Sequence, residues 1–418
     1  MIGLAAAVLL AAHLLAPPPA GAFDVKGRIS ASYMNQDDSV STHDYNVAST
    51  SLKLDASNFA GEDYFFHLNG RVRKAGSNDF NSKTPDYRVR DANFEIKRIL
   101  KKTDIVLGRQ YIGGLPGARV DGVLMKFDLG EHYGFGIFAG LKPDPYEEHF
   151  TSDYTSAGLY GYLKNKASRL SLGYERTAFK GREDSSYLYS SGSYRPNRNI
   201  YFYMSARGDR NLDNNSVELT NLLGTATYRV GKISRLRVTY NRYRAVKLYE
   251  SMDYDINREV QTAWRFYADY RIRKTTRVYG RYDLRTRSSD NKDASLYMVG
   301  VRQNRFYKWF FAEISYRVMR YFTADIKQYY VSAGADTGKN ITVQLDYTRA
   351  ENRQDDAPNK LNQEIYGASV DWYGKNRVFV TGRYEESKEK YLPIESIFTA
   401  QENDYKTRTI FLTAGYRF

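Results

Sequence analysis

The sequence predicts an all-β fold: a transmembrane, antiparallel, up-and-down β-barrel of about 22 strands, with about 20 as the next choice. The prediction rests on strand-like alternation of apolar and polar residues, on short and long connections that take turns, and on aromatic residues at strand ends. The mean hydropathy is −0.61, and after residue 22 the chain has no apolar run of the roughly 20 residues that a membrane helix needs. Strands must therefore carry any passage through a membrane.

Alternation is clearest at the end of the chain, in residues 405–418. Successive side chains of a strand point to opposite faces. One face is apolar and ends in two aromatics, and consists of Ile410, Leu412, Ala414, Tyr416 and Phe418. The other face is mostly small or polar: Thr409, Phe411, Thr413, Gly415 and Arg417. The same pattern recurs in residues 64–73, 264–272, 278–285 and 378–385. A soluble sandwich also alternates, so this pattern alone does not decide the class.

Connection lengths favour the membrane barrel, which has tight periplasmic turns at one end and longer loops at the other. Short connections are expected at residues 58–63, 100–104, 130–132, 165–168, 196–199, 231–234, 273–275, 304–307 and 374–376. Long ones are expected at 35–45, 75–86, 143–153, 180–184, 209–215, 245–259, 286–293, 349–360 and 386–403. Between Ile326 and Tyr329, the positions expected to face outward change from even-numbered to odd-numbered residues. This change predicts a bulge or a misplaced turn within residues 318–334.

Aromatic residues fall at both ends of the expected strands, as two membrane–water interfaces would select. Strands running outward end in Tyr33, Tyr174, Tyr240, Tyr282, Tyr316, Tyr347 and Tyr384. Strands running inward end in Tyr194, Tyr228, Tyr270, Trp372 and Tyr416. A sandwich has no reason to produce both rings, so the sequence favours a barrel in a membrane.

The start of the chain is expected to be a secretory signal peptide over residues 1–22, followed by one barrel domain over residues 23–418. The apolar run of residues 4–15, three prolines and a small-residue site before Phe23 carry this expectation, although the run is preceded by no Lys or Arg. Alternation begins at Val25, which leaves no plug domain ahead of the first strand. A closed wall of 22 strands would be roughly 40 Å across.

The expected inner wall is rich in arginine, with acids among them. The pore-lining candidates are Arg71, Arg73, Glu95, Arg207, Arg265, Asp269, Arg271, Arg281, Asp283, Arg285, Arg317 and Arg383. They can form ion pairs that stiffen the barrel, or a positive field that favours anions or an acidic partner. Basic residues near the outer rim can instead meet lipopolysaccharide phosphates. The sequence leaves these alternatives open.

Catalysis and resident cofactors are not expected. The chain has no Cys and a formal net charge of +14, which excludes disulfides, thiolate metal sites and covalent haem attachment. The four His after the expected signal peptide are scattered, so neither a metal site nor a Ser–His constellation is predicted. Residues 108–117 are glycine-rich, but no helix follows them, which predicts a loop rather than a phosphate cradle. Arg and Tyr fall on opposite faces, which argues against nucleic-acid binding.

The terminal pattern of Ile410, Leu412, Ala414, Tyr416 and Phe418 resembles the last strand of bacterial outer-membrane β-barrel proteins. The resemblance implies export to the bacterial outer membrane, contact with lipid and lipopolysaccharide, and recognition of this strand by the barrel-insertion machinery. In width and absence of a plug, residues 23–418 also resemble the barrel component of porin–cytochrome conduits. Some barrels of that group carry a Cys pair near the N-terminus, which this chain lacks.

Two functions follow from these resemblances. The first is a sheath for electron transfer around a periplasmic multihaem cytochrome, in which haem reaches the barrel only through that partner. The alternative is a passive porin or solute channel with a basic, anion-favouring lumen. The solute channel is favoured if a long loop folds inward and narrows the lumen. Residues 245–259 and 386–403 are the longest loops that could do so. Neighbouring genes for a cytochrome, or haem that co-purifies with the barrel, would favour the sheath.

Overall fold

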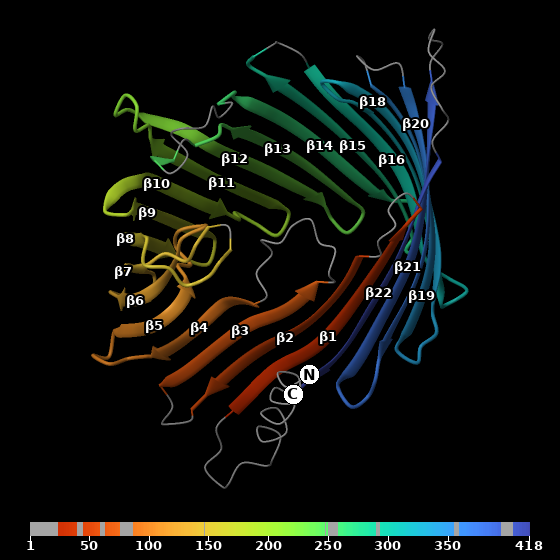
Figure 1. Cartoon of the computed structure of the whole chain (residues 1–418). Helices are drawn as coiled ribbons and strands as arrows, with labels where there is room; N and C mark the ends of the chain where they lie inside the picture. The colour runs from red at the N-terminus through yellow and green to blue at the C-terminus, as the bar shows by residue number, and fades with distance from the viewer. Residues whose placement is uncertain are drawn as a thin grey trace.

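The described residues of the computed structural model form one 22-stranded antiparallel sheet (Figure 1). The structure describes residues 24–39, 45–58, 63–75, 87–145, 147–246, 248–249, 258–289, 293–354, 359–393 and 404–418. The strands are β1 Asp24–Asp38, β2 Tyr45–Ser57, β3 Tyr64–Ala75, β4 Tyr87–Ile96, β5 Thr103–Tyr111, β6 Arg119–Asp128, β7 Tyr133–Leu141, β8 Tyr154–Lys164, β9 Ser168–Phe179, β10 Arg182–Tyr194, β11 Ile200–Arg210, β12 Val217–Val230, β13 Ser234–Tyr243, β14 Gln261–Arg271, β15 Thr276–Arg287, β16 Asp293–Phe306, β17 Phe310–Arg320, β18 Ala324–Asp336, β19 Ile341–Gln354, β20 Asn359–Tyr373, β21 Val378–Pro393 and β22 Asp404–Arg417.

The sheet closes because the first strand pairs with the last. Each strand pairs with its neighbour in sequence, and β1 pairs with both β2 and β22, from Arg28 opposite Arg417 to Asp38 opposite Thr407. At the seam, the Gly27 N–H donates to the Phe418 carbonyl over 2.9 Å and the Phe418 N–H donates back over 3.0 Å. Closure leaves no unpaired edge, which a sheet in lipid requires. The predicted fold class and strand number are confirmed.

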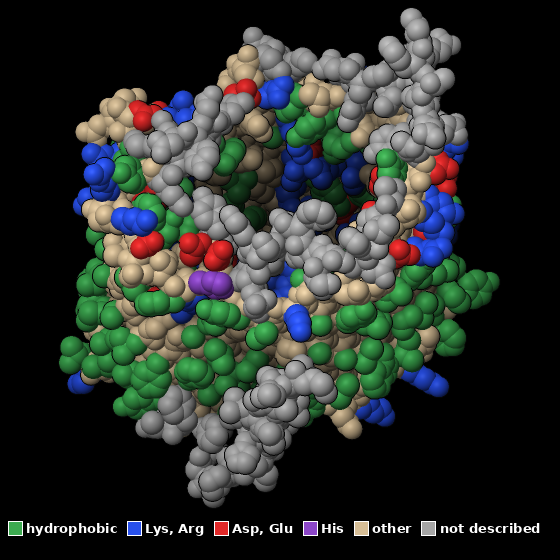
Figure 2. Space-filling model, in the orientation of Figure 1, with side chains coloured by type: hydrophobic (Ala, Val, Ile, Leu, Met, Phe, Trp, Pro, Cys, Tyr) green, Lys and Arg blue, Asp and Glu red, His purple; other side chains and the backbone are tan. Residues whose placement is uncertain are grey.

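Alternation along the strands gives the wall two different faces. Large apolar side chains are exposed on the outer face, among them Leu107, Ile137, Leu172, Met204, Phe266, Ile314, Leu345 and Leu412. Figure 2 shows hydrophobic side chains as a belt across the lower part of the visible face, with most of the charged side chains above it. Contact with lipid stabilises an apolar belt of this kind, whereas exposure to water would be unfavourable.

The wall is taller on one side than on the other. β5, β6 and β7 have 9, 10 and 9 residues, whereas β20, β21 and β22 have 15, 16 and 14. Several connections expected to be long therefore begin as strand: β21 continues to Pro393, inside the stretch predicted as a loop over 386–403.

The loop predicted at residues 180–184 is wrong. Lys180 and Gly181 alone join β9 to β10, with φ of 49° and 81°, as in a type I′ hairpin turn.

A bulge or a misplaced turn was predicted within residues 318–334, and the structure has a turn there and no bulge. Residues 321–323 turn between β17 and β18, and β18 keeps one continuous register with both β17 and β19. Tyr329 and Val331 are exposed on the outer face, so Ile326 lies on the lumen side and Lys327 on the outer side. These two residues lie beyond the apolar belt, where lipid no longer selects an apolar outer face.

The described residues contain strands and their connections, and no plug domain lies among them. No helix in this part of the chain is long and apolar enough to cross a membrane. The predicted signal peptide, residues 1–22, lies outside the described residues and stays a prediction. Most of 245–259, and all of 394–403 within the predicted loop 386–403, lie outside them as well.

Candidate functional site: the barrel lumen

The predicted pore-lining residues alternate with exposed apolar residues along the same strands. Their side chains therefore point toward the lumen. Arg71 and Arg73 flank the exposed Val72 on β3, and Arg265 lies between Trp264 and Phe266 on β14. The same alternation places the rest of the set in the lumen: Glu95, Arg207, Asp269, Arg271, Arg281, Asp283, Arg285, Arg317 and Arg383. Their roles in transport remain predictions.

Three lumen arginines converge on one carboxylate at β14 and β15. Asp283 is 1% exposed. Arg281 donates to its Oδ1 from Nε over 2.7 Å, Arg265 Nε lies 3.2 Å from its Oδ2, and Arg285 Nη2 lies 3.7 Å from the same oxygen. A nearly buried carboxylate is stabilised by such partners. One negative charge among three positive ones leaves this part of the wall net positive.

Other lumen acids hold arginines in the same way. Asp269 accepts from Arg235 Nε over 2.8 Å and lies 3.3 Å from Arg277 Nη1. Arg383 lies 3.2 Å from Asp346 and 2.9 Å from Glu385. In this respect the ion-pair network considered for the sequence is present. On β13–β15 it does not neutralise the wall, because Asp283 and Asp269 are each shared by more than one arginine, whereas Arg383 alone pairs with two acids.

The wall formed by β13–β17 therefore carries a surplus of positive charge. Its lumen-facing arginines are Arg235, Arg237, Arg265, Arg271, Arg277, Arg281, Arg285, Arg287, Arg302 and Arg317, against the acids Asp269, Asp283 and Glu313. Arg237 and Arg271 form no ion pair with a described residue. Figure 2 shows Lys and Arg side chains on the far wall, seen through the open mouth of the barrel. A wall of one sign concentrates counter-ions in a passage.

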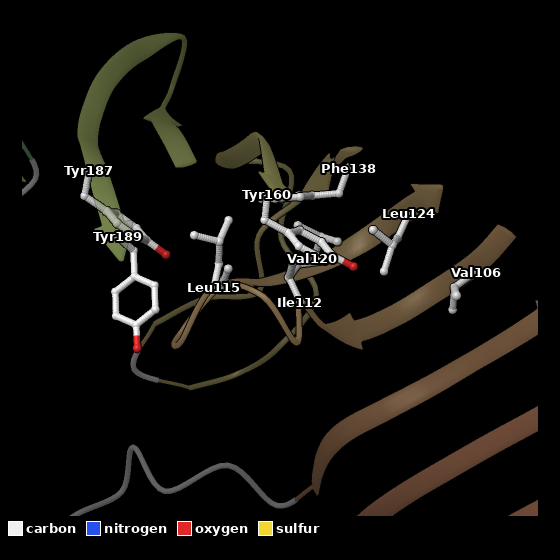
Figure 3. Packing of buried hydrophobic residues seen from close by; sticks show 10 residues of the cluster. Val106, Ile112, Leu115, Val120, Leu124, Phe138, Tyr160, Tyr187 and Tyr189 are labelled. Atoms are coloured by element: carbon white, nitrogen blue, oxygen red, sulfur yellow. The ribbon is translucent and has the colours of Figure 1, made fainter. Parts of the chain in front are cut away.

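On the side of the barrel opposite β13–β17, one connection folds into the lumen. Residues 112–118 join β5 to β6, and Ile112, Leu115 and Ala118 are buried in a cluster with the lumen-facing Val120, Tyr160, Tyr187 and Tyr189. Figure 3 shows Leu115 between the β10 tyrosines and Tyr160. Ser171 of β9 donates from its hydroxyl to the Gly114 carbonyl over 3.1 Å. The connection thus crosses the inner face from β5 as far as β10.

Two glycines make this close approach possible. A Cβ added at Gly114 would lie 2.2 Å from the Tyr160 ring, and one at Gly173 would lie 2.7 Å from a Leu115 methyl group. Neither position has room for a side chain in the observed packing. The contact between the loop and the wall therefore depends on a glycine on each side, Gly114 in the loop and Gly173 in β9.

The β7–β8 connection holds the other face of the bent β5–β6 hairpin. Arg109 and Asp121 lie opposite each other on that face and form a nearly buried ion pair at 2.5 Å. Arg109 also donates to the Glu148 carbonyl over 2.7 Å. The Glu148 carboxylate lies 2.8 Å from Arg88 Nε and 3.4 Å from Arg119 Nη1. The hairpin that carries the inward loop is thus held by the β7–β8 connection on the face away from the hydrophobic cluster.

Next to the inward loop lies a recess of about 950 Å³, lined by residues of β3–β11. Its polar lining includes His67, Asp91, Glu95 and Lys126. Lys126 Nζ lies 2.8 Å from Glu95 Oε1, and His67 Nδ1 lies 2.8 Å from Asp55. The recess is also lined by Lys164 and Arg169, so its two acids, Asp91 and Glu95, stand among four basic residues. Among the described residues no group of three or more His, Asp or Glu is placed to hold a metal ion.

The predicted aromatic girdles occupy outer-face positions. Tyr33, Tyr194, Tyr228, Tyr270, Trp372 and Tyr384 are exposed, and Tyr174, Tyr240, Tyr282, Tyr316, Tyr347 and Tyr416 are partly exposed. Neighbouring rings contact each other, for example Tyr347 and Tyr366, whose centroids are 5.1 Å apart and whose planes are tilted by 43°. The residues of the predicted insertion pattern, Ile410, Leu412, Ala414, Tyr416 and Phe418, share this outer face at the seam. Nothing in the structure tests their recognition by insertion machinery.

Sequence reasoning missed the residues that narrow the lumen. The sequence predicted a loop over residues 108–117, whereas residues 108–111 belong to β5 and the connection spans residues 112–118. The available clue was composition: Ile112, Leu115 and Ala118 are apolar, in a connection at the loop end of the barrel, where polar residues predominate. Apolar loop residues need a surface to cover them, and Val120, Tyr160 and Tyr187 provide it.

Comparisons with known proteins give a loose likeness to solved structures. No family model matches, and no curated protein matches. The solved structures include Pseudomonas aeruginosa OccK11 (OpdR), with 10% identity and a TM-score of 0.45 over 95% of this chain and 96% of that one. Acinetobacter baumannii OccAB2 has 13% identity and a TM-score of 0.45 over 94% and 98%. The Pseudomonas aeruginosa outer membrane protein opdK has 10% and 0.43 over 94% and 99%. Values this low carry no argument about transport.

The assignment therefore rests on the molecule itself. In the described strands a closed antiparallel ladder pairs the backbone groups that lipid could not satisfy, the outer face is apolar, and charged side chains lie on the lumen face. The described residues form a closed 22-stranded antiparallel β-barrel whose apolar outer face is that of a barrel in a membrane.

Proposed function

We propose that this barrel is a channel for small anionic solutes, with β13–β17 as its selecting wall. The observation that carries the proposal is the combination of the inward loop with that arginine wall. The loop at residues 112–118 narrows the passage, and the arginines of β13–β17 outnumber the acids beside them. A solute that passes a narrowed lumen must come close to the wall, where its charge decides its energy.

The inward loop favours this function over a sheath for a multihaem cytochrome. The sheath was expected because a 22-stranded barrel without a plug would leave a wide opening. The β5–β6 loop, backed by the β7–β8 connection, occupies lumen space along β5–β10 that a protein partner would need. The solute channel, given as the alternative from sequence, is therefore the better supported function.

Ion pairing sets how the wall can act on a solute. Arg265, Arg281 and Arg285 are held by Asp283 yet have side chains 46%, 25% and 36% exposed, so they still present N–H groups to the lumen. Arg237 and Arg271 form no ion pair with the described residues and are available to a passing anion. Fixed cations supply the attraction, and the shared acids keep it weak enough for release.

The direct test is the reversal potential of single channels in a salt gradient. The pure barrel should prefer chloride over potassium. Charge reversal at the two arginines without ion pairs, in R237E/R271E, should weaken or invert this preference while the Asp283 network stays intact. The matched control is K232E/K274E, with the same charge change at exposed turns outside the lumen.

The outcomes separate the two functions. Anion preference that falls in R237E/R271E and persists in the control supports the channel. Cation preference in the native barrel, or equal preference in both variants, contradicts it. A barrel that conducts only weakly and carries haem absorbance when extracted from its own membrane would favour the sheath.

A further inference from the structure

We propose that the recess beside the inward loop is a binding site for polyhydroxylated organic anions, the class to which sugar acids belong. The proposal rests on the proposed function, because the recess lies in the lumen through which solutes would pass. It adds a requirement for hydroxyl groups, which a positively charged wall alone does not impose. The recess holds about 950 Å³, and Gly113 and Gly114 of the inward loop form part of its lining. A cavity of this volume suits a small organic solute.

The strand register arranges the lumen face of β8–β11 in rows of side chains. The row nearer the short turns consists of Lys164, Arg169, Ser193 and Tyr203, each opposite the next. The row next to it consists of Tyr162, Ser171, Ser191 and Ser205. All of these except Ser205 line the recess. One row therefore places two bases beside hydroxyl groups, and the other contains hydroxyl groups alone.

The two bases form a positively charged end of the recess. Lys164 and Arg169 lie directly opposite each other, both are exposed, and neither forms an ion pair with a described residue. The acid in the row of Tyr162 is Asp128, which already accepts from the Tyr162 phenol. Like charges opposite each other on one face of a sheet repel. A carboxylate bound between the two bases converts that repulsion into two charge-assisted contacts.

The other end of the recess, on β4, offers acceptors for hydroxyl groups. Glu95 is shared by Lys126 Nζ at 2.8 Å and His67 Nε2 at 3.8 Å, and Asp91 accepts from Asn69 over 3.4 Å. These partners offset the negative charge of the two acids. A carboxylate has more lone pairs than these contacts use. Glu95 and Asp91 can therefore also accept from the hydroxyl groups of a solute.

Hydroxyl groups and phenol rings line the recess between its two ends. The hydroxyls of Ser193 and Tyr201 form no hydrogen bond with a described residue, and each can both donate and accept. The rings of Tyr201 and Tyr203 are partly exposed and add apolar surface for the C–H groups of a sugar chain. A solute without hydroxyls would displace water from these polar groups without replacing its hydrogen bonds.

The two walls of the lumen therefore select in different ways. The arginines of β13–β17 attract any anion, because their effect depends on charge alone. The recess on the facing wall combines bases for a carboxylate with donors and acceptors for alcohol groups. A sugar acid carries both kinds of group on one short chain, and it is the solute that satisfies both ends of the recess.

The test is the block of single-channel current by three six-carbon solutes. Gluconate has a carboxylate and several hydroxyls, hexanoate has the carboxylate alone, and glucose has the hydroxyls alone. Gluconate should half-block the native barrel at a concentration about tenfold lower than either of the other two. This comparison requires no variant, so it stands whether or not a substituted barrel folds.

Two pairs of variants locate the site. K164Q/R169Q should raise the half-blocking concentration of gluconate about tenfold, whereas K232Q/K274Q removes the same charge from exposed turns outside the lumen and should leave it unchanged. S193A/Y201F should reduce the difference between gluconate and hexanoate. Its control, S32A/S49A, removes two hydroxyls from the lumen face of β1 and β2, outside the recess, and should retain that difference.

The outcomes separate this site from the channel itself. Equal block by gluconate and hexanoate, or by gluconate and glucose, overturns the proposal. It is also overturned if K164Q/R169Q and K232Q/K274Q bind gluconate equally well. None of these results alters the anion preference given by reversal potentials. A barrel that prefers chloride but fails these comparisons is an anion channel without the proposed site, whereas a barrel without anion preference contradicts the proposed function.

Discussion

Asp283 shows how one residue can serve both stability and selectivity. It is nearly fully buried in the lumen wall, and Arg265, Arg281 and Arg285 all reach it. The carboxylate prevents the three guanidinium groups from repelling one another. It also cancels part of the positive charge that a solute meets. Removal of its charge should therefore change both properties, in opposite directions.

The substitution Asp283→Asn tests this at the residue scale. The amide keeps the shape but loses three charge-assisted contacts, so we expect unfolding in detergent to become easier by about 1–3 kcal/mol, a range lowered because the arginines are partly exposed. Anion preference in bilayers should rise, because the wall gains one net positive charge. Asp325→Asn, at an exposed outer-face position, is the control and should change neither. A loss of anion preference in D283N would contradict this account.

At the scale of single elements, the connection at residues 112–118 controls the width of the lumen. Leu115 is 1% exposed, and its neighbours come from strands distant in sequence. The contact with Tyr160 depends on the absence of a side chain at Gly114, whereas Gly113 has no atom within 4 Å of an added Cβ. Adjacent glycines thus give a matched pair of positions.

The substitution Gly114→Ala should push the loop off the wall, since its Cβ would overlap the buried Tyr160 ring. We expect larger and noisier single-channel conductance, together with faster proteolysis of the loop. Gly113→Ala should leave both measurements as they are in the native barrel. Identical conductance in all three proteins would mean that this loop does not limit the passage.

The sequence predicts elements well where lipid constrains them. Ile410, Leu412 and Tyr416 alternate because one face of β22 meets the apolar belt, and the strand number follows from many such segments. The prediction fails where that constraint ends. Beyond the belt, Ile326 and Lys327 break the parity without any bulge, and Lys180 and Gly181 make a tight turn where a loop was expected.

The candidate site was predictable only in part, for a related reason. Alternation alone assigns Arg265, Arg281 and Asp283 to the lumen. It does not reveal which arginines share an acid, because that depends on the register between β14 and β15. Nor does it reveal the inward loop, because the partners of Leu115 lie on β8–β10 and the pairing of distant segments is not written in local periodicity.

For the whole molecule, closure at the β1–β22 seam is the decisive step. Gly27 and Phe418 exchange two backbone hydrogen bonds, and a Cβ at Gly27 would lie 2.4 Å from the Phe418 ring. Gly27→Val should therefore strain the seam and reduce the share of barrel that resists unfolding on an unheated denaturing gel. Gly224→Val, with no atom within 4 Å of an added Cβ, is the control. Equal resistance of both variants would show that the seam tolerates the change.

The most direct test of the whole account is solute flux into liposomes that contain the pure barrel. Glucose and gluconate are close in size and differ in charge, so their swelling rates compare charge alone. A porin-like channel with the observed arginine wall should admit gluconate faster than glucose, and R237E/R271E should remove the difference. No flux of either solute, or faster entry of glucose in the native barrel, would contradict the account.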